Sequence, residues 1–278
     1  MHFLLPAQVN GHELYVVVNA GCRDKDLAHI NKHLDAAKKA GMDVSIHVHD
    51  ERGLLAVQGP AAVEAMQPLV KDDLSKLYFG MFRKIDVAGA ACFVTRTGYT
   101  GEDGFELSIP NDKLQHVTEA LLKNPRMRMC GLGARDSLRL EAGLCLYGND
   151  LDETISPIEA GLAWTVGKRR RDKFDFLGGE VIRKQLADGV TRKRVGFFCG
   201  GAPARQHSDI TTLDGKKVGE VTSGGFSPCL KKNIGQGYVD TAHAKAGTKL
   251  KVVVRGKVAD LEVAKMPFVP TKYYSAPK

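Results

Sequence analysis

The sequence lacks several features that would assign it to a class directly. It has no run of about 18 consecutive apolar residues, so no segment is predicted to span a membrane. The opening residues, MHFLLPAQVNGHE, have neither the positively charged stretch nor the long apolar core of a signal peptide. No GxSxG motif, phosphate-binding P-loop or dinucleotide fingerprint occurs. Hydrolase, NTPase and Rossmann-type functions therefore have no support in the sequence.

Cysteine and histidine do not form a recognisable metal or disulfide pattern. The six cysteines contain no CxxC pair, and several lie in apolar strand-like contexts such as ACFV and GFFC. This pattern favours reduced thiols in an intracellular compartment. His47 and His49 alternate in VSIHVHD, but we find no third ligand near them, so we expect a structural role and no metal site. The cysteines are Cys22, Cys92, Cys130, Cys145, Cys199 and Cys229.

Length and charge limit the possible classes without choosing one. A chain of 278 residues with 43% hydrophobic content can form one large domain or two ordinary ones. The net charge of +8 favours an anionic partner: a nucleic acid, an acidic protein or a polyanionic small molecule. The run KRRR at 168–171 lacks the interleaved aromatic residues of a nucleic-acid platform, which favours a solvated rim.

Hydrophobic periodicity predicts an α+β fold in which helices cover one face of mainly antiparallel sheets. The pattern changes after about residue 185 to short strands with DG and RG turns, typical of a small β barrel or sandwich. We therefore predict two domains, 1–186 and 187–278, with the boundary in KQLADGVTRK. Before it we predict strands over 13–20, 44–50, 54–60, 90–98 and 105–110, and helices over 26–41, 61–70, from 111 or 112, and 134–143.

The stretch GYTGEDGFELSI places three carboxylates beside a glycine turn. Glu102 and Asp103 at its tip are most simply solvated turn residues. Glu106 follows in a strand, on the opposite face from its apolar neighbours, and so is fixed on a rigid element. Two interpretations of Glu106 remain open at this point, an exposed strand glutamate and a ligand-binding carboxylate. The acids lack calcium-loop spacing, which argues against a metal loop.

The segment after residue 130 holds further candidates. Arg135 and Arg139 lie at i and i+4 on one face of a predicted helix, which most often means a helix with surface ion pairs. The loop over 144–167 contains acids, a Gly-Asn-Asp turn and the only tryptophan, Trp164. Long loops of this kind often carry function, although Trp164 is equally compatible with a core position.

Six strings together resemble one family over essentially the whole chain: VVNAGCRDKD, GYTGEDGFE, ARDSLRLEAGLCLYGND, AWTVGKRRR, VTSGGFSPCLKKNIGQGYV and KMPFVPTKYY. They are similar to the glycine cleavage system T-protein, the tetrahydrofolate-dependent aminomethyltransferase, and most of all to its mitochondrial form. A related branch that serves iron–sulfur cluster maturation carries a Lys-Gly-Cys motif. The comparable segment here, FLGGEVIRKQ, has no cysteine.

The resemblance implies a fold, a reaction and a set of partners. The family forms a three-domain ring around folate, with a β barrel as the last domain. It transfers the methylene carbon of an aminomethyl group, carried on the lipoyl arm of the H-protein, to tetrahydrofolate, with release of ammonia. Tetrahydrofolate is then a substrate, no metal is needed, and the P- and L-proteins of the system are indirect partners. We expect a mitochondrial matrix enzyme with no nucleic-acid or membrane partner.

The resemblance also implies site residues. Glu106 falls on the position that accepts the pterin N–H and amino groups, and Tyr99 on the position that packs the pterin. Trp164 lines the cavity. Arg135, Arg194 and Tyr273 fall on positions that reach the other polar groups of folate and the incoming lipoyl arm.

One departure from the family concerns catalysis. The family has an additional N-terminal portion and an aspartate that hydrogen-bonds folate near its reacting nitrogen, whereas MHFLLPAQVNG contains no aspartate. No catalytic residue is therefore assigned, and His2 is the one nearby group that could accept a proton. We expect the first domain to lack part of its chain. We also expect the protein to keep its affinity for folate while its rate of aminomethyl transfer is reduced. The alternative function is a catalytically impaired folate-binding homologue.

Overall fold

The computed structural model describes residues 7–277, and only the backbone of Ala7 and Gln8. The described chain divides into two compact units. The barrel unit comprises Tyr99–Gly101 and Cys130–Thr271, and the sheet unit comprises 7–98, Glu102–Met129 and 272–277. The predicted α+β class with a β barrel in the last part of the chain is confirmed.

The centre of the sheet unit is a four-stranded antiparallel sheet with the order β3-β6-β5-β4. Its strands are Arg52–Gln58 (β3), Phe82–Val87 (β4), Ala90–Thr95 (β5) and Gly104–Pro110 (β6). Alternating apolar residues predict three of them, and the predicted pairing of β5 with β6 is confirmed.

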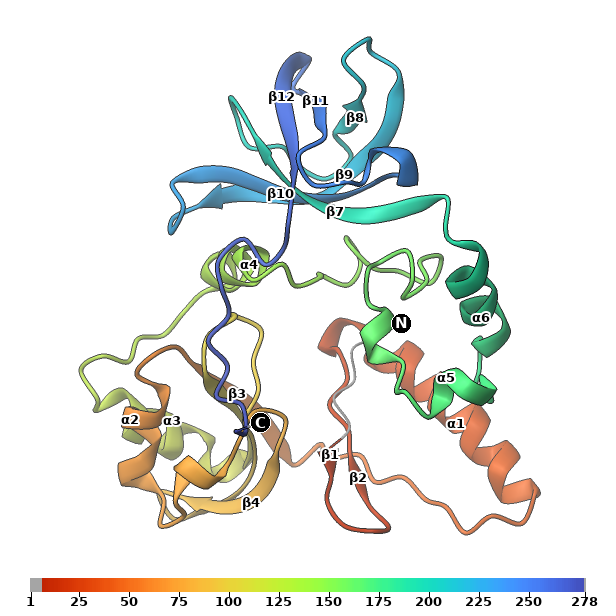
Figure 1. Ribbon diagram of the computed structural model, residues 1–278. Coiled ribbons are helices and arrows are strands. Elements are labelled where there is room, and N and C mark those ends of the chain that lie inside the picture. The colour runs from red at the N-terminus through yellow and green to blue at the C-terminus, as the bar shows by residue number, and fades with distance from the viewer. Residues whose placement is uncertain (1–6, 278) are drawn as a thin grey trace. The chain divides into compact units, whose positions relative to one another are not determined.

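Helices cover one face of this sheet, as the sequence predicts (Figure 1). Ala62–Met66 (α2) continues into the short 3-10 helix Gln67–Leu69 (η2), and Asn111–Lys113 (η4) leads into Leu114–Leu122 (α3). The core lies between helices and sheet. Its fully buried side chains include Met66, Phe105, Leu107, Ile109 and Val117.

Arg23–Lys39 (α1) is the long helix of the sheet unit, close to the predicted bounds. It follows the 3-10 turn Ala20–Cys22 (η1), in which the Asn19 side chain accepts a hydrogen bond from the Gly21 N–H. The predicted strand over 13–20 is much shorter in the structure: only Leu14–Tyr15 (β2) is a strand, paired with Ala7–Gln8 (β1).

The predicted strand over 44–50 is wrong. In the structure this segment is irregular, and no strand among residues 7–277 forms a ladder with it. Alternation of Val44, Ile46 and Val48 satisfies the sequence pattern, but a strand also needs a partner for its backbone groups. The three apolar side chains are exposed, so burial does not fix the segment as a strand either.

The barrel unit contains a closed six-stranded barrel with the order β10-β7-β12-β11-β8-β9 (Figure 1). Apolar residues that alternate along the strands fill its interior, among them Phe197, Ile210, Val252 and Leu261. The predicted domain boundary at 186/187 stays a prediction. The strands are Arg192–Cys199 (β7), Asp209–Thr211 (β8), Lys217–Ser227 (β9), Lys232–Asp240 (β10), Lys249–Val254 (β11) and Lys257–Ala264 (β12).

Helix α4, Leu132–Glu141, packs on the outside of the barrel. Leu140 forms a small apolar cluster there with Ile234 of β10 and Phe268. The remaining helices of the unit are Ala163–Thr165 (η5), Arg170–Lys173 (α5), Gly179–Asp188 (α6) and Thr241–His243 (η6). Within residues 7–277 none of the helices combines the length and the apolar character needed to cross a bilayer.

Glycines in β9 and β10 let the two strands approach closely, and Gly219 makes this testable. A Cβ added at Gly219 would lie 2.2 Å from the Tyr238 carbonyl oxygen, a backbone atom that cannot rotate away. We expect Gly219→Ala to lower the free energy of unfolding by about 1–3 kcal/mol through overpacking. Chemical denaturation checks this. Gly133→Ala is the control, because its added Cβ meets nothing within 4 Å and alanine favours α4; an equal loss in both variants would contradict the explanation.

Candidate functional site

Glu106 lies in β6 on the face of the sheet opposite the apolar core. Its sequence neighbours Phe105 and Leu107 are fully buried in that core, so strand alternation directs Glu106 to the other face. Across the ladders it faces Ala56 of β3 and Thr95 of β5. The residue is half-buried, and pairing on both sides fixes its backbone.

The face around Glu106 is polar as well as aromatic. Arg52 donates from Nε to Ser108 Oγ at 3.0 Å and from Nη2 to the Ser108 carbonyl oxygen at 2.7 Å. Burial raises the pKa of Tyr15; a hydrogen bond to Ser108 and the charge of Arg52 oppose the rise, and the Glu106 charge adds to it. The carboxylate of Glu106 is therefore in electrostatic reach of the Tyr15 hydroxyl.

Three aromatic rings pack together on the same face, where Phe82 is buried and Tyr15 and Phe93 are half-buried. The Tyr15 ring centroid lies 5.3 Å from those of Phe82 and Phe93, which are 5.8 Å apart. The Arg52 guanidinium carbon lies 4.2 Å from the Phe93 centroid. The half-buried rings of Tyr15 and Phe93, with an anchored carboxylate on the same face, suit a flat heterocycle that carries N–H donors.

The tip of the GYTGEDGF turn is not a solvated turn, which corrects the sequence expectation. Asp103 forms a two-bond pair with Arg96, at 2.9 Å to Nε and 2.5 Å to Nη2. Arg96 is only 2% exposed, and its Nη1 donates to the carbonyl oxygens of Leu74 and Leu77 at 2.7 Å. Glu102 accepts a hydrogen bond from Lys272 at 2.9 Å. Both acids are therefore structural partners of cations.

The C-terminal tail, residues 272–277, packs on the sheet unit through two tyrosines. The Tyr273 ring stacks on Phe79 with centroids 4.3 Å apart, and burial raises the pKa of its hydroxyl. Tyr274 stacks on Tyr78 at 5.4 Å, and its carbonyl oxygen accepts a hydrogen bond from the Phe79 N–H at 2.7 Å. Tyr273, a predicted site residue, is thus half-buried and held by its neighbour in sequence.

Tyr99 and Arg135 are brought together in the barrel unit. The Arg135 guanidinium carbon lies 4.5 Å from the Tyr99 ring centroid, a cation–π contact. The Tyr99 hydroxyl donates to the Cys145 carbonyl oxygen. Burial strongly raises the pKa of Tyr99, so it is a neutral phenol at physiological pH. The pair presents an aromatic ring and a cation at one place.

Arg139 departs from the expected surface ion pair, because it is 2% exposed. Its Nη1 donates to Asp150 Oδ2 at 2.7 Å, its Nη2 to Ser223 Oγ at 2.9 Å, and its Nε to Asp136 Oδ1 at 2.8 Å. Nη1 also reaches the Leu144 carbonyl oxygen at 3.1 Å. Arg139 therefore joins α4 to strand β9 and to the loop over 144–167.

Asp150 completes this buried network. It is fully buried and accepts hydrogen bonds from the Leu146 N–H at 2.8 Å, from Ser223 Oγ at 2.9 Å and from Thr222 Oγ1. Its own carbonyl oxygen accepts from the Tyr238 hydroxyl at 2.8 Å. Because Leu146 follows Cys145, the network also fixes the loop whose Cys145 carbonyl oxygen accepts the hydrogen bond from the Tyr99 hydroxyl.

Arg194 and Trp164 have contrasting environments. Arg194 is half-buried, and its Nε donates to the Ala160 carbonyl oxygen at 2.8 Å. Its Nη1 donates to Gln236 Oε1 at 2.5 Å and to the Gly143 carbonyl oxygen at 3.1 Å. Trp164 is 71% exposed, so the core interpretation of this residue is wrong.

Sequence reasoning missed the two ion pairs that hold the candidate site in place, because it treated Asp103 and Arg139 as surface residues and did not single out their partners. Arg96, Asp103, Arg139 and Asp150 are all charged, and each pair is at least partly withdrawn from water. The signal that could have found Arg96 is its place directly after the apolar strand AACFVT. Asp150 has no such signal, because its segment GNDLDE contains no cationic residue that would predict an ion pair. His2, considered as a proton acceptor, lies outside the described residues.

Comparison with known proteins gives consistent results over both parts of the chain. Residues 4–170 match the GCVT N-terminal domain, and residues 192–270 match the glycine cleavage T-protein C-terminal barrel domain. The chain is 62% identical over 269 residues to the mitochondrial aminomethyltransferase of Flaveria trinervia, covering 96% of this chain and 66% of that protein. It is 53% identical over 266 residues to the mitochondrial aminomethyltransferase of Homo sapiens, covering 95% and 66%.

A solved structure agrees with the sequence relatives. The crystal structure of glycine cleavage system aminomethyltransferase T from Bartonella henselae matches with a TM-score of 0.82 and 36% identity, covering 94% of this chain and 70% of that chain. The chain thus spans slightly less than two thirds of the length of the curated relatives. On these matches, the chain belongs to the glycine cleavage T-protein family.

Proposed function

We propose that this protein is the tetrahydrofolate-dependent aminomethyltransferase of the glycine cleavage system. It transfers the methylene carbon from the aminomethyl-lipoyl group of the H-protein to tetrahydrofolate and releases ammonia. The observation that carries the proposal is the high identity to proteins named aminomethyltransferase along nearly the whole chain. Because those relatives are named mitochondrial, we place the activity in the mitochondrial matrix.

The proposed role of Glu106 follows from the chemistry of the pterin ring. The pterin edge presents an N–H beside an amino group, and one carboxylate accepts both in a charge-assisted pair. Glu106 is supported in this role by its anchored strand position and by the half-buried aromatic rings of Tyr15 and Phe93 on the same face. A carboxylate held by a rigid strand loses little freedom on binding.

Other predicted residues receive roles that suit their environments. Tyr99 packs against the pterin, and Arg135 supplies a cation for the carboxylates of the folate tail, which a guanidinium matches geometrically. Trp164 offers an exposed aromatic surface to the ligand. Arg194 donates hydrogen bonds from Nε and Nη1 to backbone carbonyl groups. These bonds support a role in positioning that backbone, in addition to contact with the ligand. We place Tyr273 against the incoming lipoyl arm.

The proposed protein partner is the lipoylated H-protein, with the P- and L-proteins acting indirectly through it. The net charge of +8 supports an acidic partner and suits the carboxylates of folate as well. Transfer itself depends on holding the folate nitrogen against the aminomethyl carbon, so positioning by these residues contributes directly to the rate. The protein acts on tetrahydrofolate as a substrate, and no step of this proposal uses a metal.

We expect Glu106→Gln to weaken tetrahydrofolate binding by roughly 1–3 kcal/mol, because an amide cannot accept both donors as a carboxylate does. Calorimetric titration of tetrahydrofolate into the unaltered protein and the variant measures this. Glu119→Gln, on the exposed side of α3, is the matched control and should bind as the unaltered protein does. Equal affinities for the Glu106 variant and the unaltered protein would remove Glu106 from the site, and no binding by either would overturn the proposed function.

A further inference from the structure

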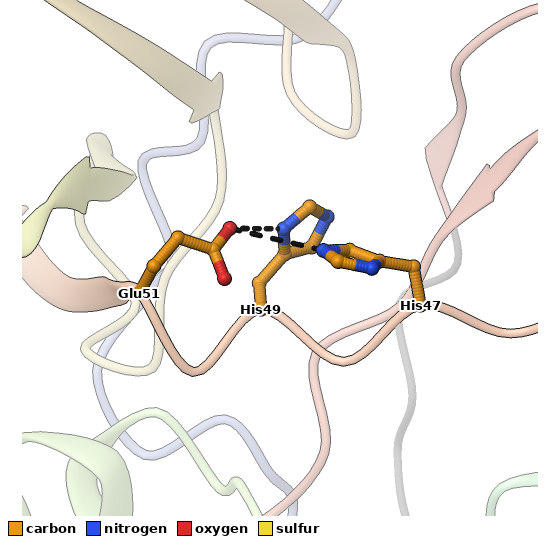
Figure 2. Close-up of side chains that lie close together, drawn as sticks. All are labelled: His47, His49 and Glu51. Carbon is orange, nitrogen blue, oxygen red and sulfur yellow. Dashed lines mark hydrogen bonds and ion pairs between the residues drawn. The ribbon is translucent and has the colours of Figure 1, made fainter.

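His47, His49 and Glu51 converge in the segment that connects α1 to β3. Figure 2 shows both imidazole rings and the carboxylate turned toward one another. His49 Nδ1 lies 2.7 Å from Glu51 Oε1, and His47 Nε2 lies 3.9 Å from the same oxygen. Each residue offers one potential ligand atom, and these three atoms all lie within 4.8 Å of one another. The sequence interpretation that the two histidines lack a third ligand therefore does not hold.

A hydrogen bond accounts for only part of this arrangement. The 2.7 Å contact of His49 with Glu51 is an ordinary hydrogen bond, but 3.9 Å from His47 is too long for one. In a tetrahedral zinc site with ligand distances of about 2.0–2.1 Å, neighbouring ligand atoms are roughly 3.4 Å apart. The two observed separations lie on either side of that value. The third separation, between the two imidazole ligand atoms, is within 4.8 Å, so side-chain rotation has to bring the three atoms together around an ion.

The backbone that carries the ligands is held in place on two sides. Arg23 of α1 pairs with Asp50 at 2.8 Å. Asn111 donates from its backbone N–H to the Glu51 carbonyl oxygen at 3.0 Å and from its side chain to the Asp50 carbonyl oxygen at 3.1 Å. The His49 ring packs against Phe93, with centroids 5.5 Å apart. The segment is therefore irregular in secondary structure but anchored at its ligand-bearing end.

We propose that His47, His49 and Glu51 bind a divalent transition-metal ion of the zinc type. Two imidazoles and one carboxylate are the donor set that such ions prefer, whereas Mg²⁺ and Ca²⁺ favour oxygen ligands throughout. Three protein ligands leave a coordination position for water. The His47 side chain is 72% exposed, so an ion can reach the site from solvent. Binding would tie His47 to the anchored end of the segment that leads into β3.

The test is calorimetric titration of Zn²⁺ into the whole protein and four variants. His47→Ala, His49→Ala and Glu51→Gln should each weaken Zn²⁺ binding by about tenfold or more, since even the loss of a residue that supports a ligand costs 10–100-fold. The double variant His29→Ala/His33→Ala is the control. Those two rings also lie close, 4.6 Å apart on α1, and could bind an ion as a pair without a carboxylate. Their removal should leave the strongest Zn²⁺ site unchanged.

Two further readouts make each outcome decisive. Circular dichroism in EDTA should show the same fold for all variants, because the ligand side chains lie outside the core. Co²⁺ in place of Zn²⁺ should give visible d–d bands but no near-ultraviolet charge-transfer band from a thiolate. This distinguishes the site from binding at the exposed Cys130 and Cys229. Absence of Zn²⁺ binding, unchanged affinity in any of the three single variants, a thiolate band, or loss of binding in the His29/His33 variant overturns the proposal.

Discussion

Arg139→Met is expected to lower the free energy of unfolding by about 3–5 kcal/mol, because it leaves a buried charge without its partner. Asp150 has no exposed surface, and its carboxylate would lose the Arg139 guanidinium while remaining enclosed. Ser223 and the Leu144 carbonyl oxygen would each lose a donor as well. Guanidinium denaturation followed by circular dichroism measures the loss. Hydrogen exchange should locate it in the barrel unit, at β9 and the loop over 144–167.

Two further variants test the explanation. The double variant Arg139→Met/Asp150→Leu removes both charges and should recover a large part of the loss, because apolar replacements of a buried pair are often tolerated. Arg170→Met breaks the exposed pair with Asp175 and should have little effect. If Arg139→Met were as stable as Arg170→Met, the buried network would not hold the unit together as described.

Arg96→Met is expected to cost about 3 kcal/mol, at the lower end for a buried ion pair because Asp103 retains some contact with water. Loss of the Arg96 guanidinium removes the donors to the carbonyl oxygens of Leu74 and Leu77. It also removes the guanidinium that lies 4.0 Å from the Tyr274 ring centroid. We therefore expect the C-terminal tail, with Tyr273, to exchange its amide hydrogens faster and to be cut sooner by protease.

Hydrogen exchange at the Phe79 amide is the most specific readout of this effect, because that N–H donates to the Tyr274 carbonyl oxygen. Lys272→Met is the control, since Lys272 lies in the same tail and loses its pair with Glu102 while the Arg96 guanidinium stays in place. The amide of Phe79 should remain protected in the control and lose protection in Arg96→Met. Equal protection in both variants would show that Arg96 does not hold the tail.

The parts of the fold that the sequence predicts correctly are those governed by local periodicity. Phe105, Leu107 and Ile109 alternate and are all fully buried, and the same alternation is sufficient to place Glu106 on the other face of the sheet. The barrel strands carry the same signal. Each of these predictions needs only the side-chain period of a strand and a core to bury one face.

The features that sequence reasoning missed depend on partners far apart in the chain. Arg139 meets Ser223 across 84 residues, and Arg96 reaches Leu74 across 22. No local pattern predicts that a charged residue will pair with a distant residue inside a core. The sequence therefore favours a surface position for Arg139, Glu102 and Asp103. Burial of charge is decided by tertiary packing, which the sequence shows only through the whole fold.

The segment over 44–50 shows the limit of periodicity itself. Alternation of Val44, Ile46 and Val48 predicts a strand, but alternation describes side chains and gives no partner for the backbone. His47, His49 and Glu51 are also two residues apart, but the sequence interpretation stopped at the two histidines and missed Glu51 as a third potential ligand. What the structure adds is their distances.

A single-turnover transfer assay tests the central claim most directly. Aminomethylated H-protein and tetrahydrofolate are mixed with this protein in excess, so that even slow transfer gives a measurable yield, and ammonia and methylenetetrahydrofolate are measured together. We predict that both products form in equal amounts, that neither forms without tetrahydrofolate, and that Glu106→Gln lowers the yield at limiting folate while Glu119→Gln does not. Ammonia release that does not depend on tetrahydrofolate, or no transfer at saturating folate, would contradict the assignment of aminomethyltransferase activity to this protein.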